Sequence, residues 1–396
     1  FGELYSWYLR NPEYRSRVQK LVQSAFAGKP EDIISQSVAK ALYGEVSPYS
    51  ATRLERFAAC AFAHFLQYGM KLTERVEYEF KPMDMGNVMH EALESFAEEV
   101  RKRGMKWTEL TEQERNEIAD RCLDNIVADY GNTVLKSSAR NEYMIERTRR
   151  ILRRTVWALQ KQLEQGEFQP EGFEVTFGGG RIDRVDIMED QNKVYVKVID
   201  YKTGNTSFDL VYLYHGLQLQ LMIYLDGALR VEQKKYPDKE IIPAGVFYYN
   251  IKDPMIQEKI DADVEAVSAG LMKELKMNGL VQADPELVYR MDSSLGSIPV
   301  AFNKDGSFRK NSSVADRTQF AVLGRYVRTK IEKIRSSILE GDAEVSPYEL
   351  GKKNACTYCP YMTVCGFDRR LSGYEFRRLK NFSDEELWKA FDREAE

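Results

Sequence analysis

The spacing of apolar residues divides the chain into helical stretches on either side of a central stretch that alternates like strands. Apolar positions recur at intervals of three and four residues before residue 166 and again toward the end of the chain, which predicts amphipathic helices. These helices are expected at 1–46 (interrupted at Pro12, 28–30 and Gly44), 52–65, 86–103, 111–130, 141–166, 215–229, 256–278, 313–340 and 384–393. Thr52 and Glu55 have the spacing of a capping box, and Asp84 is a candidate cap for the helix that follows it.

Between Phe173 and Lys202 the apolar period changes to two. A β-rich run extends from Phe173 to Met188, a polar turn follows at 189–192, and a second run extends from Val194 to Lys202. Two such runs around a polar turn predict a hairpin, and another strand is expected from Ala244 to Ile251. Helices on both sides of a central set of strands indicate an α/β fold with large helical additions.

The composition adds limits to this picture. With 43% hydrophobic and 30% charged residues, the 396-residue chain can bury a sizeable core as one large or two modest domains. No run of 18 or more apolar residues occurs, so we expect no membrane-spanning helix. The chain begins at Phe1 without Met or a signal peptide, so we expect a piece of a longer protein that works in the cytoplasm.

Basic residues gather at 147–154, although the net charge of the whole chain is −4. Helical spacing would put several of these guanidinium groups on one face, with Arg150, Arg153 and Arg154 among them. Such a face is either simply solvated or a strip that contacts phosphates, and this segment alone leaves both interpretations open.

Two aspartates and a lysine lie on the predicted hairpin. Asp183 follows Gly180-Arg-Ile on the first run, while Asp200 and Lys202 lie two apart on the second and therefore point to one face. Pairing of the two runs would bring Asp183 beside Asp200. Converging carboxylates suit a hard cation such as Mg²⁺, and a neighbouring lysine can orient an attacking water. Ordinary charges at a surface turn are the alternative.

Other polar residues are weaker candidates. His90 lies near the start of a predicted helix, where a histidine is more often half-buried than a metal ligand. Gln220 and Tyr224 are four residues apart on a predicted helix and share a face, but Gln218 is an equally good local candidate.

Four of the five cysteines form a pattern that joins the two ends of the chain. Cys356, Cys359 and Cys365 have the spacing C-x2-C-x5-C, and Cys60, expected to project from a helix, supplies a distant fourth thiol. Without a secretory signal, this set favours a metal site in a reducing compartment over disulfides. Four thiolates fit either zinc or an iron–sulfur cluster, and the spacing does not choose between them. Cys122 lies outside the pattern and is expected in the core.

Together these motifs resemble the RecB-like branch of the PD-(D/E)XK nuclease superfamily, in particular the iron–sulfur nuclease domains of bacterial helicase–nuclease complexes. The motifs occur in the family's order: Gly86-x-x-x-His90, Gly180-Arg-Ile-Asp183-Arg-Val-Asp186, Asp200-Tyr-Lys202, Gln220-x-x-x-Tyr224 and the four-cysteine bracket. The fold that this resemblance implies is a restriction-endonuclease-like core, a central mixed sheet flanked by helices, with an iron–sulfur staple. The resemblance implies a nuclease domain at 47–380, preceded by a helical segment at 1–46 that ends a helicase-like region, and followed by a helical tail at 381–396.

The resemblance also implies roles for individual residues. His90, Asp183 and Asp200 would bind a catalytic Mg²⁺ or Mn²⁺, with the backbone carbonyl of Tyr201 as a further ligand. Lys202 would position the nucleophilic water.

The remaining motif residues would support that centre. Gln220 and Tyr224 would hold the substrate or the lysine, and Arg184 would contact DNA together with the basic strip. The four cysteines would ligate a 4Fe-4S cluster that pins the ends of the domain together.

The implied activity is exonucleolytic cleavage of single-stranded DNA, on the 5′-ended strand, during helicase-coupled resection in double-strand break repair. A helicase–nuclease subunit would be the partner in a heterodimer. A catalytically silent DNA-binding or scaffolding module is the alternative, and an iron–sulfur redox enzyme lacks any flavin or nicotinamide fingerprint here.

Two departures from the family pattern stand out. No P-loop motif occurs in this sequence, so we expect no ATP hydrolysis by this chain. Three glycines after Phe177 lead directly into the Asp183 motif, which leaves open where Glu174, a further acidic candidate, lies.

Overall fold

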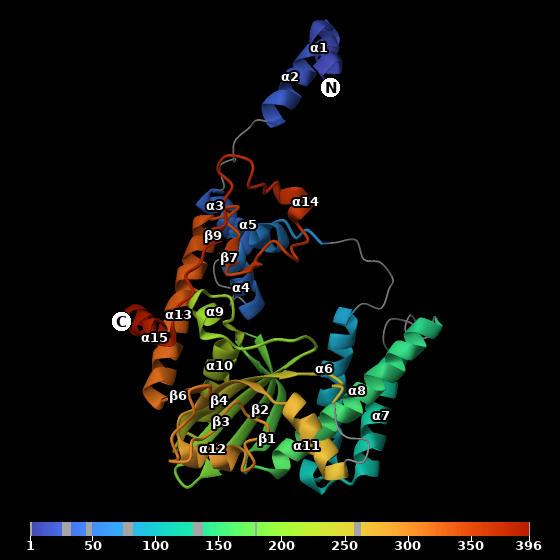
Figure 1. The fold of residues 1–396 in the computed structure, drawn as a ribbon, viewed down its shortest axis with the longest axis vertical. Coiled ribbons are helices and arrows are strands. Elements are labelled where there is room, and N and C mark those ends of the chain that lie inside the picture. Colours follow the sequence, from blue (N-terminus) through green and yellow to red (C-terminus); the bar gives the residue numbers. More distant parts are fainter. Residues whose placement is uncertain are drawn as a thin grey trace. The chain divides into compact units, whose positions relative to one another are not determined.

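The chain is described by a computed structural model that covers residues 2–25, 33–44, 50–73, 82–129, 138–178, 180–256 and 263–395, without the side chains of residues 24, 25 and 82–84. It forms two compact units, each assembled from segments that are distant in sequence. The sheet unit comprises Pro48–Thr52, Arg75–Glu332 and Phe382–Glu396, and the thiol unit comprises Phe1–Ser47, Arg53–Glu74 and Lys333–Asn381 (Figure 1). The domain boundaries expected at 46 and 380 stay predictions, and the first lies outside the described residues.

A six-stranded mixed sheet, with its strands in chain order, forms the centre of the sheet unit. Its strands are β1 (Gln169–Phe177), β2 (Gly180–Asp190), β3 (Lys193–Lys202), β4 (Glu240–Asn250), β5 (Asn278–Gln282) and β6 (Val314–Ala315). The first three strands form an antiparallel meander, and β3 then pairs with β4 in parallel. The β4–β5 pair is antiparallel and the β5–β6 pair is parallel.

The helices of the sheet unit follow the predicted pattern closely. They are α6 (Pro82–Lys102), the short η2 (Trp107–Glu109), α7 (Glu112–Asp129), α8 (Ala139–Glu164), α9 (Leu210–Tyr214), α10 (Gln220–Lys235), α11 (Val264–Glu274), α12 (Pro285–Met291), α13 (Arg317–Glu340, whose last turns belong to the thiol unit) and α15 (Asp384–Ala395). None of the described helices combines the length and the apolar character needed to cross a membrane.

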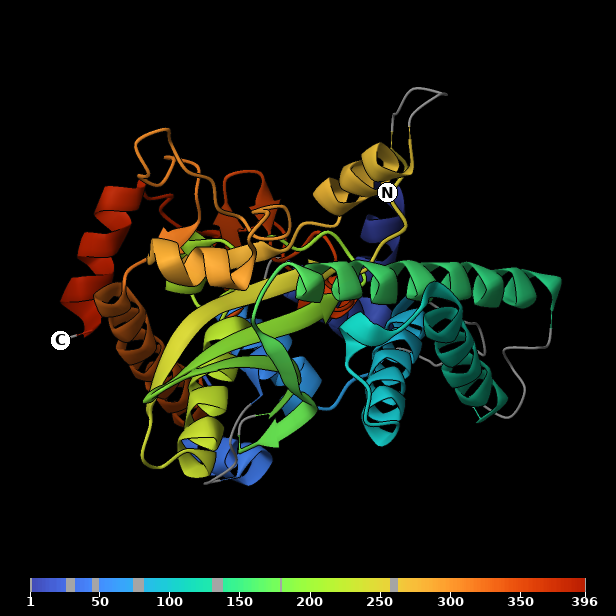
Figure 2. The same cartoon turned by 90° about the horizontal axis from the view of Figure 1, so that it is seen from below.

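The sheet is covered on both faces (Figure 2). A large core joins α6, α7 and α8 to one face, where Tyr195, Ile199 and Tyr201 of β3 are buried. Because side chains alternate along a strand, the intervening residues of β3 point to the other face, against which α10 packs. Cys122 lies in the α6–α8 core, as predicted.

The thiol unit is mainly helical, with a small three-stranded sheet in the order β8-β7-β9. Its elements are α1 (Gly2–Arg10), α2 (Pro12–Ala25), α3 (Gln36–Tyr43), α4 (Ala51–Ala59, whose first two residues belong to the sheet unit), α5 (Ala61–His64), the π-helical η1 (Phe65–Gly69), β7 (Tyr348–Leu350), β8 (Lys353–Asn354), α14 (Met362–Cys365) and β9 (Arg377–Arg378). The start and the end of the sequence therefore meet in one unit.

Several local predictions were wrong. The run from Phe173 to Met188 is two strands, because the chain reverses between Phe177 and Gly180 and pairs with itself. Cys60 does not lie within a helix: its extended backbone (φ −166°, ψ 117°) separates α4 from α5. Because α4 begins at Ala51, Thr52 lies inside the helix and the expected capping box is not formed there. The expected cap at residue 84 lies outside the described side chains.

Candidate metal centre

The β2–β3 hairpin brings two buried carboxyl groups together. Arg184 pairs with Ile199 in the antiparallel register, and continuing that register places Asp183 opposite Asp200. The backbone N–H of Tyr201 donates to Oδ2 of Asp183 at 2.7 Å, which holds this carboxyl against β3. The exposed fractions of Asp183 and Asp200 are 8% and 1%. The strand pairing expected from the sequence is therefore confirmed.

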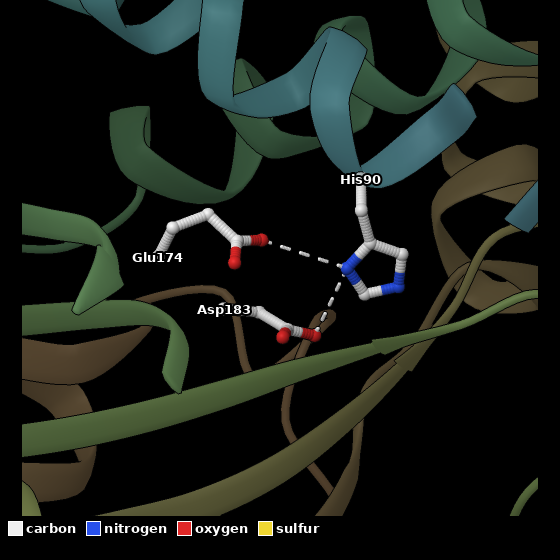
Figure 3. Close-up of side chains that lie close together, drawn as sticks. All are labelled: His90, Glu174 and Asp183. Atoms are coloured by element: carbon white, nitrogen blue, oxygen red, sulfur yellow. Dashed lines mark ion pairs between the residues drawn. The ribbon is translucent and has the colours of Figure 1, made fainter. Parts of the chain in front are cut away.

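A histidine and a second acidic residue join Asp183 at this point. Figure 3 shows His90 of α6, Glu174 of β1 and Asp183 of β2 pointing toward one another. Nδ1 of His90 lies 3.4 Å from Oδ2 of Asp183 and 3.8 Å from Oε1 of Glu174. Within the described part of the chain, this is the only group of three metal-ligating side chains whose ligand atoms all lie within 4.8 Å of one another. One imidazole nitrogen and two carboxylate oxygens can hold a divalent cation.

The sequence left the position of Glu174 open, and the structure puts it in the centre. Val175 pairs with Ile182 across β1 and β2, so Glu174 lies beside Asp183 on the adjacent strand. Glu174 has φ +50°, an unusual conformation for a residue with a side chain, and one that costs free energy unless its surroundings enforce it. Its Oε2 contacts the guanidinium of Arg181. Separating β1 from β2 at the glycines would have revealed this neighbour.

A line of polar contacts leads from Asp200 to helix α10. Nζ of Lys202 lies 2.6 Å from Oδ2 of Asp200 and donates to Oε1 of Gln220 at 2.8 Å. Nε2 of Gln220 in turn donates to the hydroxyl of Tyr224 at 2.9 Å. Gln220 and Tyr224 are one turn apart on the buried side of α10, so one helix face positions the lysine.

Gln218, the alternative to Gln220, has a different role. Its Oε1 accepts from the backbone N–H of Asp209 at 2.9 Å, and its Nε2 donates to the carbonyl of Ser207 at 2.8 Å. Gln218 therefore stabilises the loop before α9, and Gln220 is the glutamine that contacts Lys202.

Burial and like charge perturb the acid–base chemistry of this centre. Burial, reinforced by the Asp200 charge, raises the pKa of Asp183 to about 7. Burial also raises the pKa of Asp200, although Lys202 opposes this effect. Burial alone would lower the pKa of His90, but its hydrogen bond to Glu174 and the nearby carboxylates outweigh burial and raise that pKa. A cation bound here would compensate the carboxylates and release protons.

Arg184, which the resemblance assigned to DNA contact, lies inside the protein. Its side chain is 2% exposed, and its Nε and Nη2 donate to the two carboxylate oxygens of Asp186 at 2.6 and 2.9 Å. Nζ of Lys197 lies 2.9 Å from the same carboxylate, and the Arg184 guanidinium lies over the Trp107 ring. This burial does not fit a contact with DNA, because the guanidinium is already held by a buried carboxylate.

The basic strip lies on α8, away from the sheet core. Arg150 forms an ion pair with Asp253 at 2.5 Å, and Arg153 forms a two-pronged ion pair with Asp120. Together with Arg154, these arginines line one cavity of about 750 Å³ bounded by α7, α8 and α11. The strip is therefore concave, whereas the sequence distinguished only a solvated face from a phosphate-binding one.

All four cysteines of the bracket line one small apolar cavity of about 20 Å³ in the thiol unit. They are free thiols, and Cys60 is the most deeply buried of the set. Burial, with the charges of Cys60, Cys359 and Cys365, raises the pKa of Cys356 to about 11. Such mutual repulsion disappears when thiolates share a metal or cluster, so this donor set fits either zinc or iron–sulfur.

Hydrogen bonds between distant segments hold this cavity together. Phe62 donates its backbone N–H to the carbonyl of Glu344 at 3.0 Å, and the hydroxyl of Tyr361 donates to the carbonyl of Leu72 at 3.0 Å. The guanidinium of Arg377 donates to the carbonyl of Ala58. The first cysteine and the last three are thus joined by their surroundings as well as by their own side chains.

Comparison with known proteins defines the class of protein. Residues 48–366 match the family model described as the PD-(D/E)XK nuclease superfamily. The match covers most of the chain, so the chain belongs to this superfamily, and the mixed sheet flanked by helices is consistent with that membership.

Similar relatives are bacterial proteins that share one name, the AddB-type subunit of an ATP-dependent helicase/deoxyribonuclease. The chain is 42% identical to this protein from Lachnoclostridium phytofermentans, over 96% of this chain and 35% of that protein. It is 34% identical to the proteins of the same name from Thermoanaerobacter pseudethanolicus and Clostridium acetobutylicum, over 99% of this chain and 36% of each. The chain thus spans about a third of the length of these curated relatives.

Proposed function

We propose that this chain is a metal-dependent deoxyribonuclease domain that hydrolyses phosphodiester bonds of single-stranded DNA. The observation that carries the proposal is the convergence of His90, Glu174 and Asp183 beside the Asp200–Lys202 pair. This arrangement combines ligands for a divalent cation with a lysine at the same end of the sheet. Membership of a nuclease superfamily supports the assignment of these residues to phosphodiester chemistry.

The proposed ligands of Mg²⁺ or Mn²⁺ are His90, Asp183, Asp200 and the backbone carbonyl of Tyr201, to which the structure adds Glu174 as a candidate. The bound cation supplies Lewis-acid chemistry at the scissile phosphate and lowers the pKa of bound water. Burial of the carboxyls removes competing water, so they are oriented before a substrate arrives. The amide of Tyr201 keeps Asp183 aligned through its hydrogen bond.

Lys202 is the residue proposed to orient the attacking water. Its ammonium is 28% exposed and lies between Asp200 and Gln220, so it is held on two sides while it still reaches solvent. Gln220 and Tyr224 are proposed as positioning residues for this ammonium. Arg150, Arg153 and Arg154 are proposed to contact the DNA backbone without reading its sequence.

In the thiol unit we propose a 4Fe-4S cluster ligated by the four cysteines of the cavity, with a structural role. A tetrahedral zinc site holds its sulfurs about 3.8 Å apart. Among the described residues, no three cysteines have sulfurs within 4.8 Å of one another, which favours the larger cluster over a single ion. Iron and labile sulfide analysis of anaerobically purified protein tests this proposal, and stoichiometric zinc without iron would contradict it.

The name of these relatives, which joins a helicase to a deoxyribonuclease, supports a wider proposal. The chain would act as part of an AddB protein, in a heterodimer with the AddA helicase–nuclease. It would degrade the 5′-ended strand during end resection for double-strand break repair and recombination in the bacterial cytoplasm.

Substitution of Asp200 by Ala tests the nuclease proposal. We expect the variant to lose Mg²⁺-dependent degradation of single-stranded DNA while circular dichroism shows an unchanged fold. Glu189→Gln is the control, because Glu189 is an exposed acid of the sheet unit that pairs with Lys239 at 2.7 Å. Equal degradation by Asp200→Ala and the unchanged protein would favour a scaffolding module instead.

A further inference from the structure

Five side chains form a continuous stripe along α8. They are Tyr143, Arg147, Arg150, Arg154 and Trp157. Their spacing of four, three, four and three residues places them on one helix face. At 1.5 Å per residue, the stripe is about 21 Å long. All five line the cavity of about 750 Å³ described above, so the sequence pattern and the shape of the surface coincide.

The cavity is strongly positive. Its lining holds two carboxylates, Glu112 and Glu146, against six guanidinium groups. The six arginines are Arg115, Arg147, Arg149, Arg150, Arg153 and Arg154. The opposite wall comes from α11, where Val264, Val267 and Leu271 line the cavity. A basic helix therefore faces a largely apolar one.

Part of this charge is already used to hold the helices together. Arg149 bonds to Asp124 at 2.7 Å and Arg153 to Asp120, so both tie α8 to α7. Arg147 and Arg154, in contrast, form no ion pair with any residue that the structure describes. Their charges remain available to an anion.

Buried polarity points into the same space. Arg115 is 6% exposed and donates to Oε1 of Gln160 at 2.6 Å, but its Nε has no hydrogen-bond partner among the described residues. Burial lowers the pKa of Arg115, which shows that few compensating charges surround it. A guanidinium in this situation gains from an anion in the cavity.

The aromatic residues indicate what kind of anion fits. Tyr143 is 65% exposed, and the guanidinium of Arg154 lies over the Trp157 ring with its centre 5.1 Å away. Phosphate contacts alone would suit duplex or single-stranded DNA equally. Exposed aromatic faces between arginines favour a single strand, whose unpaired bases can stack on them.

We propose that this cavity is an accessory site for single-stranded DNA, distinct from the metal centre. Arg147 and Arg154 contact successive phosphates, and bases stack on Tyr143 and Trp157. The site deepens the proposed function on which it rests: it holds the strand outside the catalytic residues and makes cleavage depend on strand length.

Contacts at one rim connect the cavity to the end of the sheet that carries the lysine. Arg150 pairs with Asp253, which lies three residues beyond the end of β4. Asn250, the last residue of β4, is in register with Lys202. Three residues span at most about 10 Å, so a strand that leaves this rim is close to the sheet end that carries Lys202.

Binding measurements test the accessory site directly. Fluorescence anisotropy of a 16-nucleotide single strand is measured with the intact protein without divalent ions, so no cleavage is required. We expect Arg147→Ala/Arg154→Ala to weaken binding about tenfold and to reduce the salt slope by about 1.4, the value for two phosphates. Tyr143→Ala should also weaken binding about tenfold, whereas Tyr143→Phe should retain affinity.

Arg230→Ala/Arg328→Ala is the matched control. It also removes two positive charges from the sheet unit, but these arginines are exposed and pair with Asp226 outside the cavity. Unchanged affinity and slope in the Arg147/Arg154 variant, equal loss in the control, or duplex binding as tight as single-strand binding would overturn the proposal. Thermal melting of each variant identifies any loss that comes from unfolding, in which case Arg147→Gln/Arg154→Gln replaces the alanine pair.

Cleavage kinetics separate this proposal from the nuclease proposal. With strands of about 4 and about 16 nucleotides, the Arg147/Arg154 variant should raise KM for the longer strand more than for the shorter one. An equal rise for both lengths would contradict the accessory site. Absence of cleavage with every strand would refute the nuclease proposal, while the binding experiment would still decide whether the cavity holds DNA.

Discussion

Two aspartates of β2, three residues apart, have opposite environments. Asp186 is fully buried between Arg184 and Lys197, and although burial alone would raise its pKa, these two cations lower it. Asp183 points to the other face of the sheet, near Glu174, and its pKa is raised to about 7. The same residue type on one strand is therefore charge-compensated on one face and under-compensated on the other.

This difference separates a structural acid from a functional one. A buried carboxylate with two cations at hydrogen-bond distance already has its compensation and needs no ligand. A carboxylate that faces other acids is costly in isolation, and such clusters persist where a bound cation compensates them. Asp183 thus marks the metal centre, and Asp186 marks the internal support of the sheet.

The largest expected effect comes from exchanging each aspartate for asparagine. Asp183→Asn should reduce Mg²⁺-dependent cleavage at least about 1,000-fold, because it removes a proposed metal ligand. Without metal it should be no less stable than the unchanged protein. Asp186→Asn should instead lower the free energy of unfolding by about 3–5 kcal/mol, because it leaves two buried cations uncompensated. Cleavage assays and urea denaturation measure the two effects, and a reversed pattern would refute the comparison.

The two lysines of β3 extend the same contrast. Lys202→Met should lower kcat about 100-fold while Mg²⁺ affinity and stability change little, because the ammonium positions water rather than the metal. Lys197→Met should leave Asp186 with one cation fewer and appear as a loss of stability. Steady-state kinetics and thermal melting distinguish them, and an unaltered kcat in Lys202→Met would remove this residue from the mechanism.

Glu174→Gln should have an intermediate effect. We expect Mg²⁺ affinity to fall about 10–100-fold, with much of the lost rate recovered at high Mg²⁺ concentration. The measurement is a Mg²⁺ titration of the cleavage rate at pH 8. A rate loss that high Mg²⁺ does not restore would assign Glu174 to the chemistry instead of to metal binding.

The smallest effect is the pH dependence of the metal-free and metal-bound states. The folded pKa of Asp183, about 7, lies above the ordinary value of 3.8, so its contribution to stability is fully present below pH 4 and is lost as the pH rises to 7. Mg²⁺ binds the carboxylate form, so its affinity should rise up to tenfold per pH unit below 7 and level off above it. Affinity that does not depend on pH between 5 and 8 would contradict this assignment.

The part of the site that local pattern determines could be predicted from the sequence. Alternation along β3 puts Asp200 and Lys202 on one face, and the hairpin turn puts Asp183 opposite. His90 and Gln220 were named through resemblance, because no local signal connects a helix residue to a distant strand end.

The remainder depends on tertiary context. Glu174 was left open because the glycine-rich reversal after Phe177 hides a strand boundary, and because a positive φ has no sequence signature. Arg184 was assigned to DNA because periodicity does not say which face of a strand meets a charged partner. Cys60 was expected on a helix because the apolar spacing continues across the break between α4 and α5.

Binding of Mn²⁺, followed by the electron paramagnetic resonance signal of the free ion at pH 8, tests the central claim most directly. The account predicts that the unchanged protein and Glu189→Gln bind Mn²⁺ at one common class of site, and that Asp183→Asn loses that binding while it remains folded. Equal Mn²⁺ binding by Asp183→Asn would contradict the assignment of His90, Glu174 and Asp183 as the metal centre.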